Sequence, residues 1–224
     1  VLVIDRSGSM SPQYKSGAVQ DLVERILPVG MAFDDNEEID VYIFHDDAIK
    51  CISANISNIS GYVNRYINNI DFGGTAYAPI INKIVKDFGG NTGGGSNNNS
   101  GGFFKKLLNL GSSNNSNNGS PSAALEYPVY VIFVTDGENS DRAQAIEAIT
   151  NASRYGIFFQ FIGIGNETFS FLKKLDSMNG RFIDNANFFQ QPDLSRTSDT
   201  QLYNLLMSEF PQWLKEAKPK NLIK

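Results

Sequence analysis

The sequence is poor in the two residue types on which most metal centres and nucleophilic active sites depend. Its 224 residues include one cysteine, Cys51, and one histidine, His45. A single cysteine cannot form an internal disulfide and is typical of a reducing compartment, so we expect a cytoplasmic protein. One histidine cannot build a zinc cluster and argues against a Ser-His-Asp triad, and we expect His45 to be a turn residue.

The chain also lacks long apolar runs and clusters of basic residues. No apolar stretch is long enough to cross a membrane and no signal peptide is recognisable, so a membrane is not an expected partner. The net charge is −5, from 19 Lys and Arg against 24 Asp and Glu, and without a basic cluster we expect no nucleic-acid partner. Because the chain begins inside a predicted strand and without methionine, we expect it to be a fragment of a longer protein.

What the chain does contain is an alternation of strand and helix patterns. Its 224 residues are enough for one domain with a sizeable core. Short β-branched or aromatic runs predict strands at residues 1–4, 39–44, 48–52, 129–136, 157–165 and 181–183, with a loop at 187–189. Apolar residues at helical spacing predict helices at residues 12–33, 59–67, 77–88, 141–155, 168–178 and 199–217, with Pro211 bending or interrupting the last. This alternation predicts an α/β fold with a mostly parallel sheet, helices on both faces, and one antiparallel edge strand from the 39–52 hairpin.

Residues 89–122 differ from the rest of the single domain that we expect over residues 1–224. They are nearly all Gly, Asn and Ser, a composition that cannot bury a core, and we interpret them as a flexible insertion at the surface. One segment within it, residues 103–110, holds Phe and Leu at helical spacing beside two lysines. A short helix packed back on the domain is the favoured interpretation, and a docking peptide for a partner or a membrane surface is the alternative.

The candidate functional residues begin where the first predicted strand ends. Asp5, Ser7 and Ser9 alternate in the sequence, so in an extended segment their side chains point the same way. One carboxylate and two hydroxyl oxygens on one side of a strand-to-helix turn are hard ligands, which suit a cation such as Mg²⁺. Because Asp and Ser are also common helix N-caps, this pattern alone does not decide between capping and metal binding.

The Asp-x-Ser-x-Ser pattern resembles the von Willebrand factor A (vWA) family, in which it opens the metal-ion-dependent adhesion site (MIDAS). That family takes a third hydroxyl ligand from a threonine in a later loop and a second acid from a strand that ends in Thr-Asp-Gly. By this resemblance the remaining ligands are Thr75, after Gly73 and Gly74, and Asp136, at the end of the strand of residues 129–136. Thr75 could instead be a plain loop residue and Asp136 part of an ordinary turn, but the matched set of three motifs favours metal binding.

Longer stretches make the chain most similar to the bacterial tellurium-resistance and stress-response (Ter) branch of this family, with copine-like A domains more distant. The stretches are residues 5–14, 33–35, 39–41, 134–138 and 210–214. The resemblance covers the chain outside the insertion at 89–122, and it implies the three-layer, Rossmann-like vWA fold. It also implies that the strands before Asp5 and Asp136 are neighbours, with the metal beyond their carboxyl ends.

The resemblance further implies a protein-binding module rather than an enzyme. The neutral hydroxyls of Ser7, Ser9 and Thr75 would bind Mg²⁺ (or Mn²⁺) directly, while Asp5 and Asp136 would bind it directly or through water. Few charges around the ion leave it electrophilic, so that one exchangeable position accepts a carboxylate from a partner protein, as in the family.

Two other functions remain open on the sequence. A haloacid-dehalogenase-type phosphatase also begins with a strand that ends in aspartate and binds Mg²⁺, but it needs a second aspartate where this chain has Ser7. A structural vWA module with a vestigial site would carry the same motifs without binding a cation. Glu138, close to Asp136 in the sequence, is expected to tune the site or to oppose acidic partners.

Overall fold

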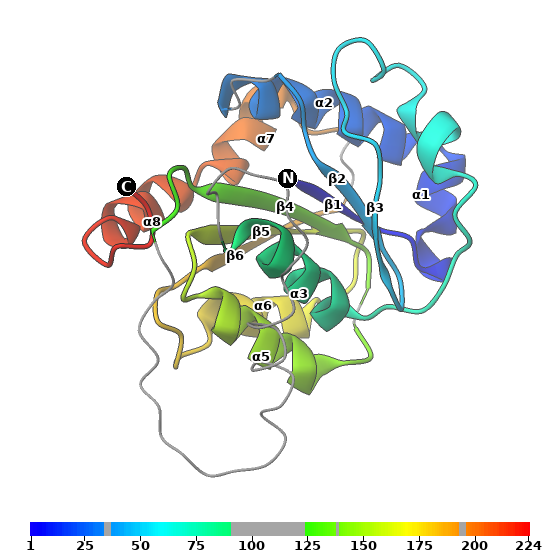
Figure 1. Cartoon of the computed structure of the whole chain (residues 1–224). Helices are drawn as coiled ribbons and strands as arrows, with labels where there is room; N and C mark the ends of the chain where they lie inside the picture. Colours follow the sequence, from blue (N-terminus) through cyan, green and yellow to red (C-terminus); the bar gives the residue numbers. More distant parts are fainter. Residues whose placement is uncertain (34–36, 91–123, 138, 193–195) are drawn as a thin grey trace, which may run out of the picture.

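The centre of the fold is a six-stranded sheet with the strand order β3-β2-β1-β4-β5-β6 (Figure 1). It is seen in a computed structural model that describes residues 1–33, 37–90, 124–137, 139–192 and 196–224. The strands are β1 (Leu2–Asp5), β2 (Val41–Phe44), β3 (Ala48–Lys50), β4 (Val129–Thr135), β5 (Ile157–Ile164) and β6 (Ala186–Gln191). Neighbouring strands are parallel except β2 and β3, which form the predicted antiparallel hairpin at one edge. The predicted mostly parallel α/β sheet is therefore confirmed.

Helices cover both faces of this sheet, which is the middle of three layers (Figure 1). One face carries α1 (Ser11–Lys15), α2 (Ala18–Phe33) and α7 (Asp199–Leu206), and the other carries α3 (Tyr77–Phe88), α5 (Arg142–Ala152), α6 (Ser170–Ser177) and α8 (Phe210–Ala217). Alternate residues of a central strand enter the two cores: Leu2 and Ile4 pack on the α2 side, and Val3 packs on the α3 side. Because both faces are buried, β1 is apolar along its whole length up to Asp5, which is why its pattern predicts a strand.

The last strand is the main correction to the sequence prediction. The strand predicted at residues 181–183 is wrong, because the chain bends there, and β6 instead includes the residues 187–189 that we expected in a loop. β6 is a polar edge strand: the Asn187 amide donates hydrogen bonds to Gln160 on β5 (3.0 Å) and to Ser208 (2.9 Å). Such pairing depends on the tertiary structure and leaves no alternating pattern in the sequence.

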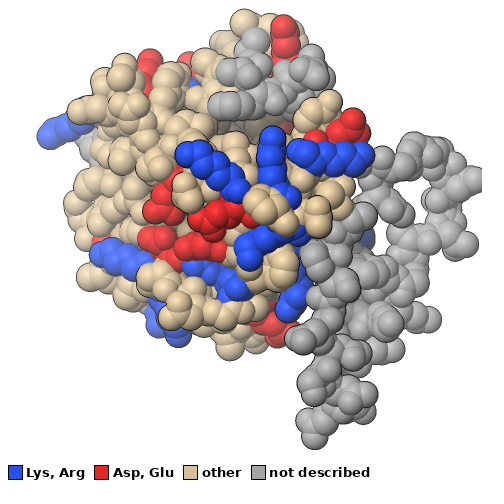
Figure 2. Space-filling view, turned by 90° about the vertical axis from the view of Figure 1, so that its left-hand side faces the viewer, with Lys and Arg blue, Asp and Glu red and all other residues tan. Residues whose placement is uncertain are grey.

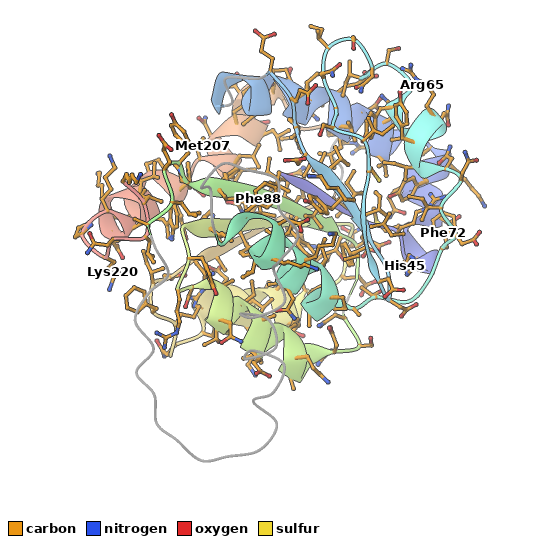
Figure 3. The ribbon with its side chains drawn as sticks, in the orientation of Figure 1. His45, Arg65, Phe72, Phe88, Met207 and Lys220 are labelled. Atoms are coloured by element: carbon orange, nitrogen blue, oxygen red, sulfur yellow. The ribbon has the colours of Figure 1, made fainter. Side chains whose placement is uncertain are left out.

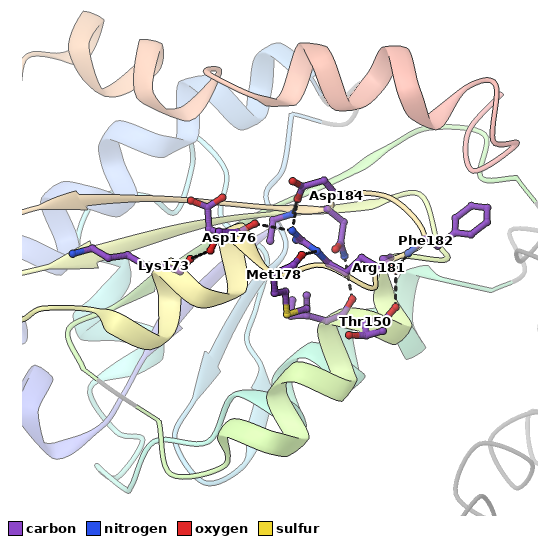
Figure 4. Close-up of polar contacts among 12 residues, drawn as sticks. Thr150, Lys173, Asp176, Met178, Arg181, Phe182 and Asp184 are labelled. Atoms are coloured by element: carbon purple, nitrogen blue, oxygen red, sulfur yellow. Dashed lines mark hydrogen bonds and ion pairs between the residues drawn. The ribbon is translucent and has the colours of Figure 1, made fainter. Parts of the chain in front are cut away.

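Arg181 explains why the chain bends before β6 (Figure 4). Its guanidinium donates hydrogen bonds to the carbonyl oxygens of Asp176 (2.6 Å) and Met178 (3.2 Å), and it forms an ion pair with Asp184 at 2.7 Å. The arginine side chain is 3% exposed, so these contacts hold the connection between α6 and β6 from the inside. Because its partners lie within five residues on both sides of it, the backbone must curve around the Arg181 side chain and cannot be extended there.

Three predicted helices are divided or shortened. The helix predicted after the first strand is two, α1 and α2, separated near Gly17, whose φ of +83° favours glycine. The helix predicted over residues 199–217 is α7 and α8, and Pro211 lies in the first turn of α8, so its predicted interruption is confirmed. The apolar pattern at residues 59–67 forms only a π-helical turn, Val63–Ile67.

The insertion predicted at residues 89–122 lies almost wholly outside the described residues, as does its segment 103–110. Gly89 and Gly90 follow α3, and the description resumes at residue 124. The division of the chain into one domain with an insertion therefore stays a prediction. In the described part of the chain, no helix is both long enough and apolar enough to cross a bilayer.

Candidate metal site

The predicted metal ligands follow the two central strands of the sheet. β1 ends at Asp5 and β4 ends at Thr135, and the two strands pair directly, with Ile4 opposite Val134. The chain passes from β1 into α1 on one face and from β4 into α5 on the other. The carboxyl ends of β1 and β4 thus meet at a topological switch point, which is where open α/β sheets bind ligands.

A chain of hydrogen bonds joins four of the five predicted ligands. The Ser7 and Ser9 hydroxyl oxygens lie 3.0 Å apart, and the Ser9 hydroxyl donates to Asp136 Oδ1 at 2.8 Å. Asp5 Oδ1 accepts the backbone N–H of Ser7 at 2.6 Å. Asp5, Ser7 and Asp136 are buried whereas Ser9 is exposed, so the group opens to solvent on the Ser9 side.

Burial makes both carboxylates costly to ionise. It raises the pKa of Asp5 to about 6, although hydrogen bonds from the Thr135 hydroxyl and from Ser7 oppose the increase. Burial also raises the pKa of Asp136, where the Ser9 hydrogen bond opposes it and the negative charge of Glu167 adds to it. A cation between the two would offset this cost, because an opposite charge favours the ionised form.

Thr75 joins this group through its backbone rather than through its hydroxyl. The preceding Gly73 pairs with the segment after β1: its N–H donates to the Arg6 carbonyl (3.2 Å), and its carbonyl accepts the N–H of Gly8 (3.1 Å). On the other side, the Thr75 carbonyl accepts hydrogen bonds from the N–H and the hydroxyl of Ser140, each at 2.9 Å. Within the described residues, the Thr75 hydroxyl forms no hydrogen bond to the other four predicted ligands.

The glycines before Thr75 are required by the turn beside them. Asp46 Oδ2 accepts the N–H of Gly74 at 2.8 Å, and a Cβ on Gly74 would lie 2.3 Å from Asp46 Oδ1. A Cβ on Gly73 would lie 2.9 Å from the Cβ of His45. His45 Nδ1 accepts the N–H of Asp46 at 2.7 Å, so His45 is the turn residue that the sequence predicts. Figure 3 shows His45 and Phe72, which precedes Gly73, on loops at this edge of the sheet.

Arg6, inside the first motif, is a supporting residue that the motif does not reveal. Its guanidinium lies over the rings of Tyr14 (4.3 Å) and Phe72 (3.8 Å). It also donates hydrogen bonds to the carbonyls of Asn68 (3.1 Å) and Ile70 (2.9 Å). Arg6 is buried and thereby ties the segment before Thr75 to the end of β1. The sequence signals this supporting role only by placing a charged residue directly after a buried strand. An arginine that is buried there needs hydrogen-bond acceptors from another segment.

Three further supporting side chains come from β4, α3 and the segment between β4 and α5. The Thr135 hydroxyl donates to Asp5 Oδ2 at 2.6 Å, so both oxygens of Asp5 are hydrogen-bonded. The Tyr77 hydroxyl lies 3.2 Å from Thr135 Oγ1 and donates to the Gly137 carbonyl at 2.7 Å. Asp141 stands at the N-cap position of α5, but its carboxylate accepts the N–H groups of Tyr77 and Ala78 in the first turn of α3. These contacts join residues more than fifty positions apart, so local patterns do not predict them.

Oxygen donors dominate this edge of the sheet. Among the described residues, no three Cys, His, Asp or Glu side chains gather in a way that could hold a metal ion. The oxygen donors that the hydrogen bonds bring together are two serine hydroxyls and two carboxylates, a set that suits hard divalent ions. Glu138 lies outside the described residues, so its expected influence on the site stays a prediction.

Sequence comparison matches nearly all of the chain. The model of the vWA-TerF-like family, described as vWA found in TerF C terminus, matches residues 1–96 and 116–223. The uncharacterized protein YcbR of Bacillus subtilis (strain 168) is 36% identical over 227 residues, which cover 100% of this chain and 80% of YcbR.

Solved structures share the fold at low sequence identity. Proximal thread matrix protein 1 (PTMP1) from the mussel byssus, with a zinc-occupied MIDAS motif, has a TM-score of 0.56 at 13% identity. The match covers 92% of this chain and 44% of PTMP1, so the chain spans less than half of that protein. The manganese-loaded TRAP protein of Plasmodium vivax has a TM-score of 0.50 at 14% identity, over 84% of this chain and 66% of TRAP. At these identities the likeness shows the fold alone.

Proposed function

Since the chain belongs to the vWA-TerF-like family, we propose that it is a Mg²⁺-dependent protein-binding module with an intact MIDAS. The observation that carries the proposal is the chain of hydrogen bonds Ser7–Ser9–Asp136 beside Asp5. The TerF-like family description and the resemblance to the Ter branch support a role in tellurium resistance and stress response. We assign the module to the cytoplasm, in keeping with its single cysteine.

The donor set fits Mg²⁺ or Mn²⁺. Ser7 and Ser9 offer neutral hydroxyl oxygens, and Thr75 is the third hydroxyl of the proposed set. Asp5 and Asp136 supply the negative charge. Burial makes that charge costly even with the hydrogen bonds present, as the raised pKa values of both groups indicate. Mg²⁺ prefers oxygen ligands and readily keeps waters, which suits a site that is buried at Asp5 and open at Ser9.

When bound, the cation supplies an electrophilic position that a carboxylate from a partner protein can fill. The residues of this chain hold that position in place: the serines and Thr75 add no charge to it, and the carboxylates balance it. The partner is therefore a protein that presents an exposed Asp or Glu. Nucleic acid is disfavoured by the net charge of −5 and by the absence of a basic cluster from the sequence.

The surroundings of Asp5 favour binding over catalysis. A phosphatase of the rival type would need Asp5 as a nucleophile, but Asp5 is fully buried and both of its oxygens accept hydrogen bonds. The position two residues on, where such an enzyme needs an acid, is Ser7. Metal-dependent hydrolysis of a generic phosphate ester that Asp5→Asn abolishes would contradict the binding proposal.

Calorimetric titration of the chain with Mg²⁺ and Mn²⁺ tests the site. We expect Ser9→Ala to weaken Mg²⁺ binding by about tenfold or more, and Thr75→Ala to weaken it as well, since each removes a proposed ligand. Ser9 is exposed, so its loss should leave the thermal midpoint without metal nearly unchanged. Ser177→Ala is the control and should leave binding intact. It removes a hydroxyl on α6 that, among the described residues, bonds the Lys173 carbonyl alone.

The outcomes separate the candidate functions. A wild-type chain that binds neither ion at millimolar concentrations would favour a structural module with a vestigial site. Binding that Thr75→Ala does not change would remove Thr75 from the ligand set. A pull-down from native lysate, with Mg²⁺ against a chelator, then tests whether a protein partner depends on the metal.

A further inference from the structure

Four hydrogen bonds attach Thr75 and the first turn of α3 to Ser140 and Asp141, which follow β4. Two run from the N–H and hydroxyl of Ser140 to the Thr75 carbonyl, each at 2.9 Å. The other two run from the N–H groups of Tyr77 (2.9 Å) and Ala78 (2.7 Å) to the two carboxylate oxygens of Asp141. Two consecutive residues after β4 therefore hold both Thr75 and the start of the helix that follows it.

Asp141 acts as an N-cap for a helix other than its own. It occupies the N-cap position of α5 but makes no side-chain cap bond there. The first turn of α3 begins after Ala76, which has no side chain able to cap, so the N–H groups of Tyr77 and Ala78 need an outside acceptor. The Asn139 amide donates to Asp141 Oδ1 at 2.7 Å and holds the carboxylate in this orientation.

A second contact ties the same turn of α3 to the end of β4. The Tyr77 ring is buried, and its hydroxyl donates to the Gly137 carbonyl at 2.7 Å. Thr75 thus lies between two fixed points, the pairing of Gly73 with the segment after β1 and the Asp141 contacts with α3. The distance between Thr75 and Asp136 is set by these contacts and not by the local sequence.

We propose that Asp141 is a positioning residue for the metal site, which holds the Thr75 loop against the Asp136 segment and so sets the affinity for the cation. This inference rests on the proposed function. Supporting side chains of this kind commonly change metal affinity by about tenfold or more without touching the ion. The competing explanation is that Asp141 only stabilises α3, as any helix cap would.

A second cap in the same chain separates the two explanations. Ser198 caps α7 in a capping box with Gln201, on the opposite face of the sheet from α3. We expect Asp141→Ala and Ser198→Ala each to lower the thermal midpoint by about 2–4 °C, the usual effect of losing a cap in a domain of this size. Only Asp141→Ala should weaken Mg²⁺ binding in calorimetry, by about tenfold.

Asp141→Asn distinguishes position from charge. It removes the same charge as Asp141→Ala, but its amide oxygen can still accept one N–H of α3. We expect its Mg²⁺ affinity to lie closer to wild type than to that of Asp141→Ala. Wild-type affinity in Asp141→Ala would overturn the inference, and equal weakening in the Asn and Ala variants would assign the effect to charge and overturn it too.

Hydrogen exchange measured without metal keeps the inference testable on its own. A cap that only stabilises α3 would affect the Tyr77 and Ala78 amides alone, whereas loss of a positioning residue should also loosen the Thr75 loop. We therefore expect faster exchange of the Gly73 and Ala76 amides, which bond the carbonyls of Arg6 and His45, in Asp141→Ala than in wild type. No change is expected there in Ser198→Ala. If wild type binds no Mg²⁺, the proposed function fails, and this exchange experiment still decides whether Asp141 holds the loop. Unchanged exchange of the Gly73 and Ala76 amides in Asp141→Ala would overturn the positioning role whatever the metal result.

Discussion

All three oxygen atoms of Asp5 accept hydrogen bonds. Ser7 N–H and the Thr135 hydroxyl occupy its two oxygens, and the Tyr14 hydroxyl donates to its carbonyl at 3.0 Å. Burial raises its pKa from 3.8 to about 6 in spite of the hydrogen bonds. Between these values the folded chain keeps a proton that the unfolded chain releases, so the free energy of unfolding falls as pH rises through this window. Above about pH 6 the full cost of the buried charge is present.

Mg²⁺ should therefore stabilise the protein more at about pH 7.5 than at about pH 5. At the higher pH the cation offsets the charge of Asp5, whereas at the lower pH it must displace a proton first. We expect affinity to fall by about tenfold between these conditions, a change of about one pKa unit in free energy. Thermal unfolding with and without millimolar Mg²⁺, at both pH values, measures this. Asp5→Asn should show no metal response at either pH, and an equal response of wild type at both would contradict the assignment of Asp5.

Individual site residues could be predicted from the sequence only where a motif sets their positions. Asp5, Ser7 and Ser9 are two residues apart and follow one strand, and Asp136 follows the neighbouring strand, so the structure brings their side chains together. Thr75 comes from a loop whose position depends on contacts with residues that are distant in the sequence. Its hydroxyl forms no hydrogen bond to the other four predicted ligands, all of which the structure describes. Local spacing contains no information about such contacts.

At the scale of elements, the central strands and the β2–β3 hairpin are predictable from the sequence, and the edge strand β6 is not. A strand buried on both faces is a continuous apolar run, and β1, β2 and β5 are buried throughout. β6 lies at the edge, and its Asn187 bonds Gln160 inside the sheet, so its polar residues resemble a loop. The helix before Gly17 and the π-helical turn Val63–Ile67 are short, and tertiary packing rather than propensity maintains them.

Two buried arginines each hold a connection between elements, and they make a matched pair for mutation. Arg6 fixes the segment before Thr75, whereas Arg181 fixes the connection between α6 and β6 (Figure 4).

Figure 2 shows the side of the molecule near α8, where acidic side chains gather and Lys and Arg border them. Burial raises the pKa values of Asp176, Asp184 and Glu209, and the charge of Arg181 counteracts the increase in each.

We expect Arg6→Met and Arg181→Met each to lower the free energy of unfolding by about 3 kcal/mol, because each removes a buried charge from partners that stay behind. Only Arg6→Met should weaken Mg²⁺ binding, by about tenfold, because only Arg6 supports the loop that carries Thr75. Chemical denaturation and calorimetry below the unfolding transition measure the two effects. Equal Mg²⁺ affinity in wild type and Arg6→Met would show that the loop keeps its place without the guanidinium.

For the molecule as a whole, described residues anchor the chain on both sides of residues 91–123. α3 packs in the core before them, and after them Leu125 pairs with the C-terminal segment: its N–H donates to the Leu222 carbonyl (3.0 Å), and its carbonyl accepts the N–H of Lys224 (2.9 Å). Tyr155, near the end of α5, approaches Gly89 closely. The described residues on either side of 91–123 are thus held by contacts with the rest of the described fold.

Deleting residues 91–120 and joining the ends with a short Gly/Ser link should leave the fold and the metal site intact. Loop-closure entropy changes slowly with length, so the free energy of unfolding should change by less than about 1 kcal/mol. The thermal midpoint and the Mg²⁺ affinity of the shortened chain measure this. Loss of cooperative unfolding would show that the Phe and Leu residues at 103–110 belong to the core.

The pairing of β1 with β4 has a consequence for the order of events during folding. Leu2 lies opposite Ile132, so the two strands that precede the acids meet only after β4 has been made and brought back across the intervening residues. A nascent chain that ends before β4 has no place for a cation, and contacts of such long range form slowly. A bound ion would therefore stabilise the folded domain but not the states that precede it. It should slow unfolding and leave the folding rate unchanged.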